Sequence, residues 1–175
     1  LMPTKIIYEP SYGRFESLVG VGKQMMEIVD LRPEDVVVLS SHSSIVPTVV
    51  EVAIAAKERG ASLIVITSLE GAQKQQAIHP SGKKAYEMAD VVIDTCFPYS
   101  EAMFDPEGKD TEVIGMSYYA TIVILQTITM LVMERLSELK LSHLIMGATG
   151  SKLDPKSVPF VRDTYKKYKT RTQRF

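Results

Sequence analysis

Residues 35–68 read DVVVLSSHSSIVPTVVEVAIAAKERGASLIVITS, and this stretch decides the expected fold. A valine-rich run over 36–39 ends in small hydroxyl residues, a helical segment follows, and a second apolar run covers 62–67. This order of strand, loop, crossover helix and strand is typical of a βαβ unit. Both runs are apolar at successive positions, as in strands that helices cover on both faces of a parallel sheet. The stretch therefore predicts an α/β fold with a parallel central sheet.

The segment from Val46 to Arg59 predicts the crossover helix. Pro47 is tolerated because it falls in the first turn, where a missing N–H has no helical partner to lose. Apolar positions that recur at helical spacing predict a face packed on the sheet. They are Val49, Val50, Ala53 and Ile54. Glu51 lies one turn into this helix, and we interpret it as a carboxylate on the solvent side rather than as a base at the site.

The loop after the first strand carries the candidate site. It consists of Ser40, Ser41, His42, Ser43 and Ser44. Ligands of open α/β sheets bind outside the carboxyl ends of the strands. Backbone N–H groups at a helix N-terminus, together with hydroxyl groups, bind small anions such as phosphate. Polar loops at this place also merely cap the helix, so the residue types alone leave both interpretations open. We interpret His42 as a loop side chain rather than a catalyst.

Three stretches resemble the sugar isomerase (SIS) domain, a family that binds phosphosugars. The first is SHSS at 41–44, which stands where the family has Ser-x-Ser-Gly. The second is AAKERGA at 55–61, which leads into the next apolar run. The third is IHPSGKKAYE at 78–87 followed by ADVVID at 89–94, which is similar to largely uncharacterised SIS proteins often labelled phosphoheptose isomerase-like.

The resemblance covers roughly residues 1–150 and implies a three-layer α/β sandwich with a parallel, flavodoxin-like sheet; residues 151–175 would form a basic C-terminal extension. It also implies a sugar-phosphate site built from hydroxyl, histidine and lysine side chains near the strand ends. The candidates are Ser41, His42, Ser43, Ser44, Ser68, Ser81 and Lys83. Ser44 departs from the family pattern, because a glycine there lets the backbone approach a ligand closely and an added Cβ narrows the site.

Aldose–ketose isomerisation of a sugar phosphate is the activity that the resemblance implies. Such a reaction needs a base beside a sugar carbon and a proton donor at the oxygen, and our candidates are Glu16 and His79. Glu16 lies in the first turn of a helix expected over 15–29, where the helix dipole alone would stabilise an acidic residue. His79 stands beside Ser81 and Lys83, and an equally good interpretation has Ser81 capping a helix and the lysine facing water.

Two other functions remain open. A non-catalytic sensor or regulatory SIS domain would bind a sugar phosphate without turnover, and a relative with a decayed site would bind none.

No cofactor or metal is expected, because the chain has one cysteine, three separated histidines and no Walker A, GxGxxG or HExxH motif. We expect a homodimer or higher homo-oligomer, since SIS proteins are commonly dimers. The longest predicted helix, 115–140, is apolar most of the way round and should be buried on more than one side.

Three further segments complete the expected order of elements. Residues 70–76 are polar and predict a mobile loop, 90–95 predict a third strand, and 141–148 predict an edge strand. SIS domains usually begin with a helix and a first strand, and nothing before Lys5 can serve as these. Either this part of the protein is incomplete here, which we favour, or the protein lacks it.

The composition agrees with one globular domain, since 45% of the 175 residues are hydrophobic. The net charge is −1, but residues 151–175 contain eight Lys or Arg and two Asp, a net +6, so the remainder carries −7. A solvated tail, or one docked on another subunit, is a better interpretation than contact with nucleic acid.

Cys96 has no partner for an intrachain disulfide and fits a reducing compartment. The longest apolar stretch, 120–133, is interrupted by polar residues and predicts no membrane span, so the cytoplasm is the expected location.

Overall fold

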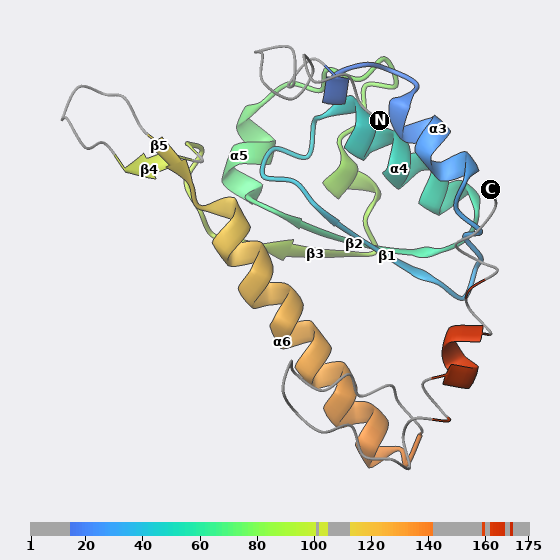
Figure 1. The fold of residues 1–175 in the computed structure, drawn as a ribbon. Helices are drawn as coiled ribbons and strands as arrows, with labels where there is room; N and C mark the ends of the chain where they lie inside the picture. Colours follow the sequence, from blue (N-terminus) through green and yellow to red (C-terminus); the bar gives the residue numbers. More distant parts are fainter. Residues whose placement is uncertain are drawn as a thin grey trace. The chain divides into compact units, whose positions relative to one another are not determined.

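A parallel sheet of three strands forms the centre of the first part of the chain (Figure 1). The computed structural model describes residues 15–100, 102–104, 113–141, 159, 162–166 and 169. The strands are β1 (Val36–Ser40), β2 (Ser62–Thr67) and β3 (Val91–Asp94), in the order β1-β2-β3, and both pairs run parallel. The predicted α/β fold with a parallel central sheet is confirmed.

The carboxyl ends of the three strands meet at one edge of the sheet. Ser40 pairs with Ile66, and Thr67 pairs with Asp94. Backbone hydrogen bonds continue past the ladder, because Ser68 N donates to His42 O at 3.2 Å and Thr95 N donates to Thr67 O at 2.8 Å. The loops that follow the three strands are therefore held against one another.

Two helices and one 3₁₀ helix lie on one face of this sheet (Figure 1). They are α3 (Val21–Glu27), α4 (Pro47–Glu58) and η1 (Ala85–Met88). Buried alanines of α4 and η1 pack on Leu63 and Val65 of β2, and the small side chains let the helices approach the sheet closely. The helix and strand bounds agree with the sequence to within one residue for β1, α4 and β2.

On the opposite face of the sheet, several described side chains are exposed. Val36 and Val38 of β1 are 56% and 40% exposed, and Val91 of β3 is 49% exposed. These side chains share one face, because Val38 and Val91 both pair with Ile64. Among the described residues of the first unit, burial is thus concentrated on the face that carries α4.

The mobile loop predicted over 70–76 is wrong, because the helix α5 (Leu69–Lys74) occupies most of it. Ser68 precedes this helix, and its Oγ accepts a hydrogen bond from Gly71 N at 2.9 Å. Glu70 and Lys74 form an ion pair four residues apart, with 2.5 Å between the charged atoms. A serine N-cap, an acidic first turn and a basic last turn all stabilise a short helix.

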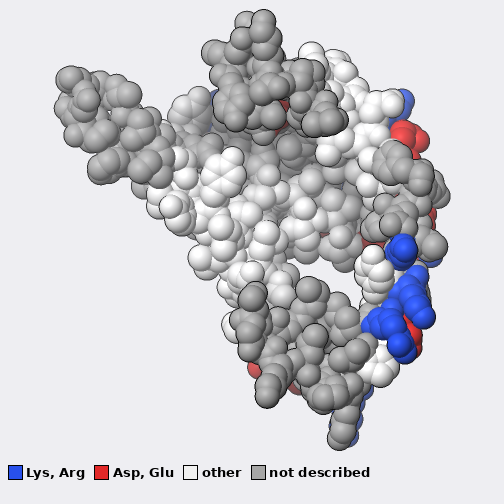
Figure 2. Space-filling model, in the orientation of Figure 1, with Lys and Arg blue, Asp and Glu red and all other residues white. Residues whose placement is uncertain are grey.

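A long apolar helix, α6 (Ser117–Glu138), follows a two-stranded antiparallel sheet of β4 (Ala102–Phe104) and β5 (Val113–Gly115). The chain divides into two compact units, 1–121 and 122–175, and the division falls inside this helix. The visible surface over the first turns of α6 is uncharged (Figure 2). We expected this helix to be buried on more than one side. Within the described residues the expectation is not confirmed, since α6 has no buried residue.

By length and composition α6 is also able to cross a membrane, which differs from the expectation for residues 120–133. One such helix is weak evidence for a membrane span, because core helices of soluble proteins have the same length and composition. Of the edge strand predicted over 141–148, residues 142–148 lie outside the described residues. In the basic tail, the described residues 159, 162–166 and 169 are helical.

Candidate functional site

A cavity of about 860 Å³ opens at the carboxyl end of β1. Residues 40–43 of the Ser loop, which we define as residues 40–44, line it together with the first turn of α4. Other walls come from α3, from Gln75 at the end of α5, from Tyr99 after β3 and from the first turn of α6. All these residues belong to the first unit of the chain. The position agrees with the rule that ligands bind at the carboxyl ends of parallel strands.

Ser41 and Ser43 line this cavity, as the sequence predicted. The Ser41 hydroxyl accepts a hydrogen bond from Ser44 N at 3.2 Å, so its own proton can still be donated to a ligand. Val46 is the N-cap of α4, and among the described residues no side chain caps this helix. The N-cap Val46 and, in the first turn of α4, Thr48 line the cavity, so the N-terminus of this helix and the hydroxyls of Ser41 and Ser43 border one space.

His42 also lines the cavity and joins the Ser loop to the segment after β3. Its Nε2 lies 3.2 Å from the carbonyl oxygen of Tyr99. A carbonyl oxygen only accepts, so Nε2 carries a proton in this contact. Its Nδ1 is buried and has no hydrogen-bond partner within the part of the chain that the structure describes. A Cβ added to Gly71 would lie 3.1 Å from His42 Nε2, so α5 approaches this ring closely because residue 71 is glycine.

Ser44 and Ser68 are buried and lie outside the cavity lining. The Ser44 hydroxyl donates to Thr67 Oγ1 at 2.9 Å, and Thr67 Oγ1 donates to His42 O at 2.9 Å. The Ser68 hydroxyl donates to Phe97 O at 2.7 Å while capping α5. These two serines hold the loops that form the cavity in place.

Replacing Ser44 with glycine is expected to leave the free energy of unfolding within about 1 kcal/mol of the unmodified chain. Ser44 has φ of 55°, and relief of this left-handed conformation, worth about 1 kcal/mol, offsets the loss of one hydrogen bond of similar strength. Ser44→Ala loses the same hydrogen bond without this relief and should be less stable than Ser44→Gly by about 1 kcal/mol. Urea unfolding of the two variants measures the difference, and an alanine variant more stable than the glycine variant would contradict the expectation.

The two acid–base candidates lie in different places. Glu16 is exposed and lines the cavity, and its carbonyl oxygen accepts a hydrogen bond from Thr48 Oγ1 at 2.8 Å. The His79 side chain is 10% exposed and lies outside the lining, with Nε2 3.6 Å from Glu51 Oε1. Its Nδ1 is 2.7 Å from the hydroxyl of Ser81. Ser81 and Lys83 are exposed and also lie outside the lining, so the structure joins only Glu16 to the Ser loop cavity.

Glu51 is buried, so its assignment to the solvent side is wrong: its side chain is 8% exposed. The carboxylate accepts hydrogen bonds from Gly20 N and, at 3.2 Å, from Lys23 N, and so caps the N-terminus of α3 from the neighbouring helix. Burial acts to raise the pKa of Glu51, but the amides of Gly20, Lys23 and Gly22 with nearby His79 together hold this pKa below its ordinary value.

A sequence signal for this burial was present. The positions three and four residues from Glu51 along α4 are uncharged, and they include Pro47, Ile54 and Ala55. An acidic residue among apolar helix neighbours shares the buried face and needs hydrogen-bond donors there. Within the described ranges, no group of three or more His, Cys, Asp or Glu side chains is placed to hold a metal ion.

Comparison with known proteins identifies relatives of this chain. Residues 2–68 match the family model described as SIS domain. A UPF0309 protein of Listeria monocytogenes is 36% identical over 126 residues, which cover 72% of this chain and 54% of that protein. A UPF0309 protein of Caldanaerobacter subterraneus is 34% identical over 123 residues, covering 70% of this chain and 48% of the relative.

A UPF0309 protein of Geobacillus kaustophilus is 51% identical over 79 residues, covering 45% of this chain and 32% of the relative. The chain thus spans about half the length of the first two relatives and a third of this one.

Proposed function

We propose that this chain, whose residues 2–68 match the SIS-domain model and which is similar to UPF0309 proteins, binds a sugar phosphate in the cavity at the carboxyl end of β1. One observation carries the proposal: the hydroxyls of Ser41 and Ser43 and the first turn of α4 border the same space. Hydroxyl donors and the positive end of a helix dipole together favour a phosphate group. His42 lines the cavity beside them and positions the loop.

The roles of the remaining serines follow from their hydrogen bonds. Ser44 and Ser68 support the phosphate site indirectly, because their hydroxyls bond to Thr67 and to Phe97 O. Ser81 and Lys83 lie on an exposed turn outside the cavity lining. The proposal therefore assigns direct contact with phosphate to Ser41 and Ser43.

The chemical step that we propose is aldose–ketose isomerisation, with the Glu16 carboxylate as the base. Glu16 is exposed to the cavity, as a group that takes a proton from a bound sugar must be. His79 lies against Glu51 instead. This separation favours a second candidate function, a sensor that binds a sugar phosphate without turnover. For either function we propose a cytoplasmic homo-oligomer.

Replacing both Ser41 and Ser43 with alanine is expected to weaken sugar-phosphate binding by at least tenfold. Each lost hydrogen bond to a charged phosphate is worth roughly 1.5 kcal/mol or more, and about 1.4 kcal/mol corresponds to tenfold in affinity. Isothermal titration with inorganic phosphate and with hexose phosphates measures the affinity. Ser62→Ala is the matched control, because Ser62 is exposed at the opposite end of β2. Equal affinities of the double variant and the control would exclude the site.

A turnover assay separates the two candidate functions. An aldose phosphate that binds is incubated with the protein, and conversion to the ketose is followed by NMR. Conversion that Glu16→Gln abolishes without loss of binding supports the isomerase. Binding without conversion supports the sensor.

A further inference from the structure

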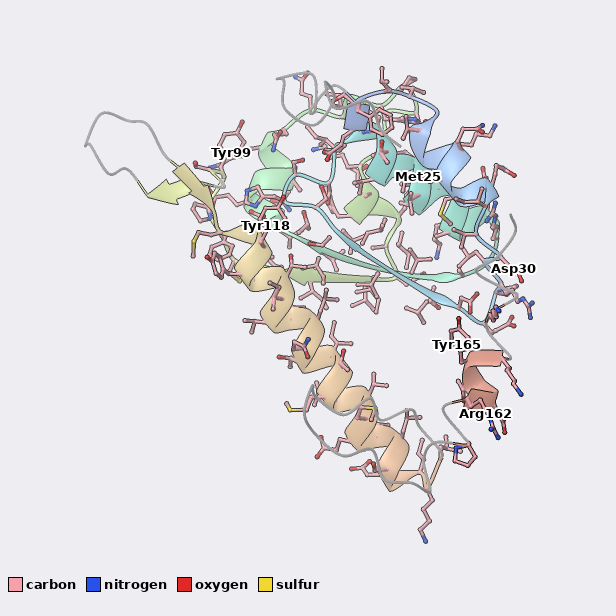
Figure 3. The ribbon with its side chains drawn as sticks, in the orientation of Figure 1. Met25, Asp30, Tyr99, Tyr118, Arg162 and Tyr165 are labelled. Carbon is pink, nitrogen blue, oxygen red and sulfur yellow. The ribbon has the colours of Figure 1, made fainter. Side chains whose placement is uncertain are left out.

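Two tyrosines line the cavity from segments outside the Ser loop. Tyr99 follows β3, and Tyr118 belongs to the first turn of α6 (Figure 3). Their side chains are large and yet 50% and 74% exposed. Aromatic side chains exposed inside a concave site offer an apolar face with a polar tip to a ligand.

Tyr99 is held in a set position relative to the Ser loop. Its carbonyl oxygen lies 3.2 Å from His42 Nε2, and the carbonyl of Phe97 accepts from the Ser68 hydroxyl at 2.7 Å. The ammonium of Lys74 lies 5.8 Å from the centroid of the Tyr99 ring, a cation–π distance. Backbone and ring are thus both anchored, one to the loop and one to α5.

Tyr118 is tied to the same strand end by its own helix. Thr121 lies one turn further along α6, and its Oγ1 is 2.6 Å from Ser40 Oγ at the end of β1. Residues three apart lie on one side of a helix, so this hydrogen bond sets the first turn of α6 against the Ser loop. Both tyrosines are therefore placed relative to the hydroxyls of Ser41 and Ser43.

We propose that Tyr99 and Tyr118 form an aromatic platform for the ring of a cyclic sugar phosphate, so that the cavity prefers ring-form sugar phosphates to short open-chain phosphates. The proposal rests on the proposed function, which places the phosphate at the Ser loop. A pyranose ring presents C–H groups on its faces and hydroxyls at its edge. The C–H faces match the tyrosine rings, and the hydroxyls match polar residues of the wall such as Glu16, Thr48 and Gln75. A short open-chain phosphate leaves the rings uncovered.

Calorimetric titration with three probes tests the platform: inorganic phosphate, glycerol 3-phosphate and glucose 6-phosphate. We expect the unmodified chain to bind glucose 6-phosphate at least tenfold more tightly than glycerol 3-phosphate. Tyr99→Ala and Tyr118→Ala should each remove most of this preference and leave the affinity for inorganic phosphate unchanged. Tyr119→Ala is the matched control, because Tyr119 is the next residue of the same helix, is 61% exposed and lies outside the cavity lining.

The outcomes distinguish the platform from the phosphate site. If neither inorganic phosphate nor either organic phosphate binds the unmodified chain, the proposed function fails and the platform with it. If phosphates bind but both tyrosine variants keep the full preference for glucose 6-phosphate, only the platform is overturned. An equal loss of preference in Tyr119→Ala also overturns it, because that loss would come from a general change in α6. Tyr118→Phe should keep the preference, since the ring face remains.

Discussion

Replacing Gly22 with alanine is expected to lower the free energy of unfolding by about 3 kcal/mol, through overpacking. Gly22 lies in α3 where this helix crosses α4, and an added Cβ would stand 2.3 Å from the carbonyl oxygen of Thr48 and 2.8 Å from Glu51 Cβ. Neither neighbour is the end of a flexible side chain, so the two helices must move apart. In an open helix position the same change would stabilise the protein by up to about 1 kcal/mol. A large loss therefore measures the close contact of the helices.

Thermal and urea unfolding measure this loss. For a chain of this length, about 3 kcal/mol corresponds to a fall in Tm of roughly 6 to 12 °C. Gln24→Ala is the matched control, because Gln24 is exposed in the same helix and should change stability by less than about 0.5 kcal/mol. A Gly22→Ala variant as stable as the unmodified chain would show that α3 does not rest on α4 in this way. Val21 and Met25 line the cavity from α3, so the shift should also weaken ligand binding.

Replacing Glu51 with glutamine is expected to lower stability at pH 7 by about 2 kcal/mol, the cost of leaving buried donors poorly matched. The two carboxylate oxygens accept hydrogen bonds from the backbone N–H groups of Gly20 and Lys23. In glutamine one of these oxygens becomes an NH₂ group, which donates and would face a backbone N–H that also donates. The shape of the side chain is retained, so the change reports on the hydrogen bonds rather than on packing. α3 should lose its anchored N-terminus, and with it the wall of the cavity that it supplies.

The pH dependence of this loss has a definite sign. The pKa of Glu51 in the folded protein lies below its ordinary value, so the folded state binds the proton less readily than the unfolded state. The carboxylate therefore contributes its stability above the ordinary pKa of about 4.3, and this contribution is lost as pH falls toward the folded pKa. The stability difference between the unmodified chain and Glu51→Gln should be largest near neutral pH and shrink in acid.

Urea unfolding at a series of pH values tests this dependence. Glu58→Gln serves as the control, because Glu58 is exposed in the last turn of the same helix. The control should show a small difference in stability at every pH. A Glu51→Gln difference that stays constant or grows as the pH falls below 5 would contradict the capping role of the carboxylate.

Local sequence patterns alone determined the β1–α4–β2 unit and the place of the Ser loop. The predicted bounds of β2 match at both ends, and those of α4 lie within one residue, because apolar spacing reports the conformation of contiguous residues directly. The position of Ser41 and Ser43 at a cavity followed from the same unit, since parallel strands end at one edge. The helix α5 also had local signals in Ser68, Glu70 and Lys74, but the polar composition of the segment outweighed them in the prediction.

Only the tertiary structure decided which residues share the site. Gly20 and Glu51 are 31 positions apart, and their hydrogen bond exists because α3 crosses α4 at Gly22. His42 and Tyr99 are 57 positions apart, and they meet because β1 and β3 flank β2 and end together. Burial and hydrogen-bond partners depend on such distant pairs, whereas periodicity reports only on neighbours along the chain. The sequence therefore determined the place of the Ser loop that lines the cavity, and packing decided that Glu16 and two tyrosines also line it while His79 stands beside Glu51.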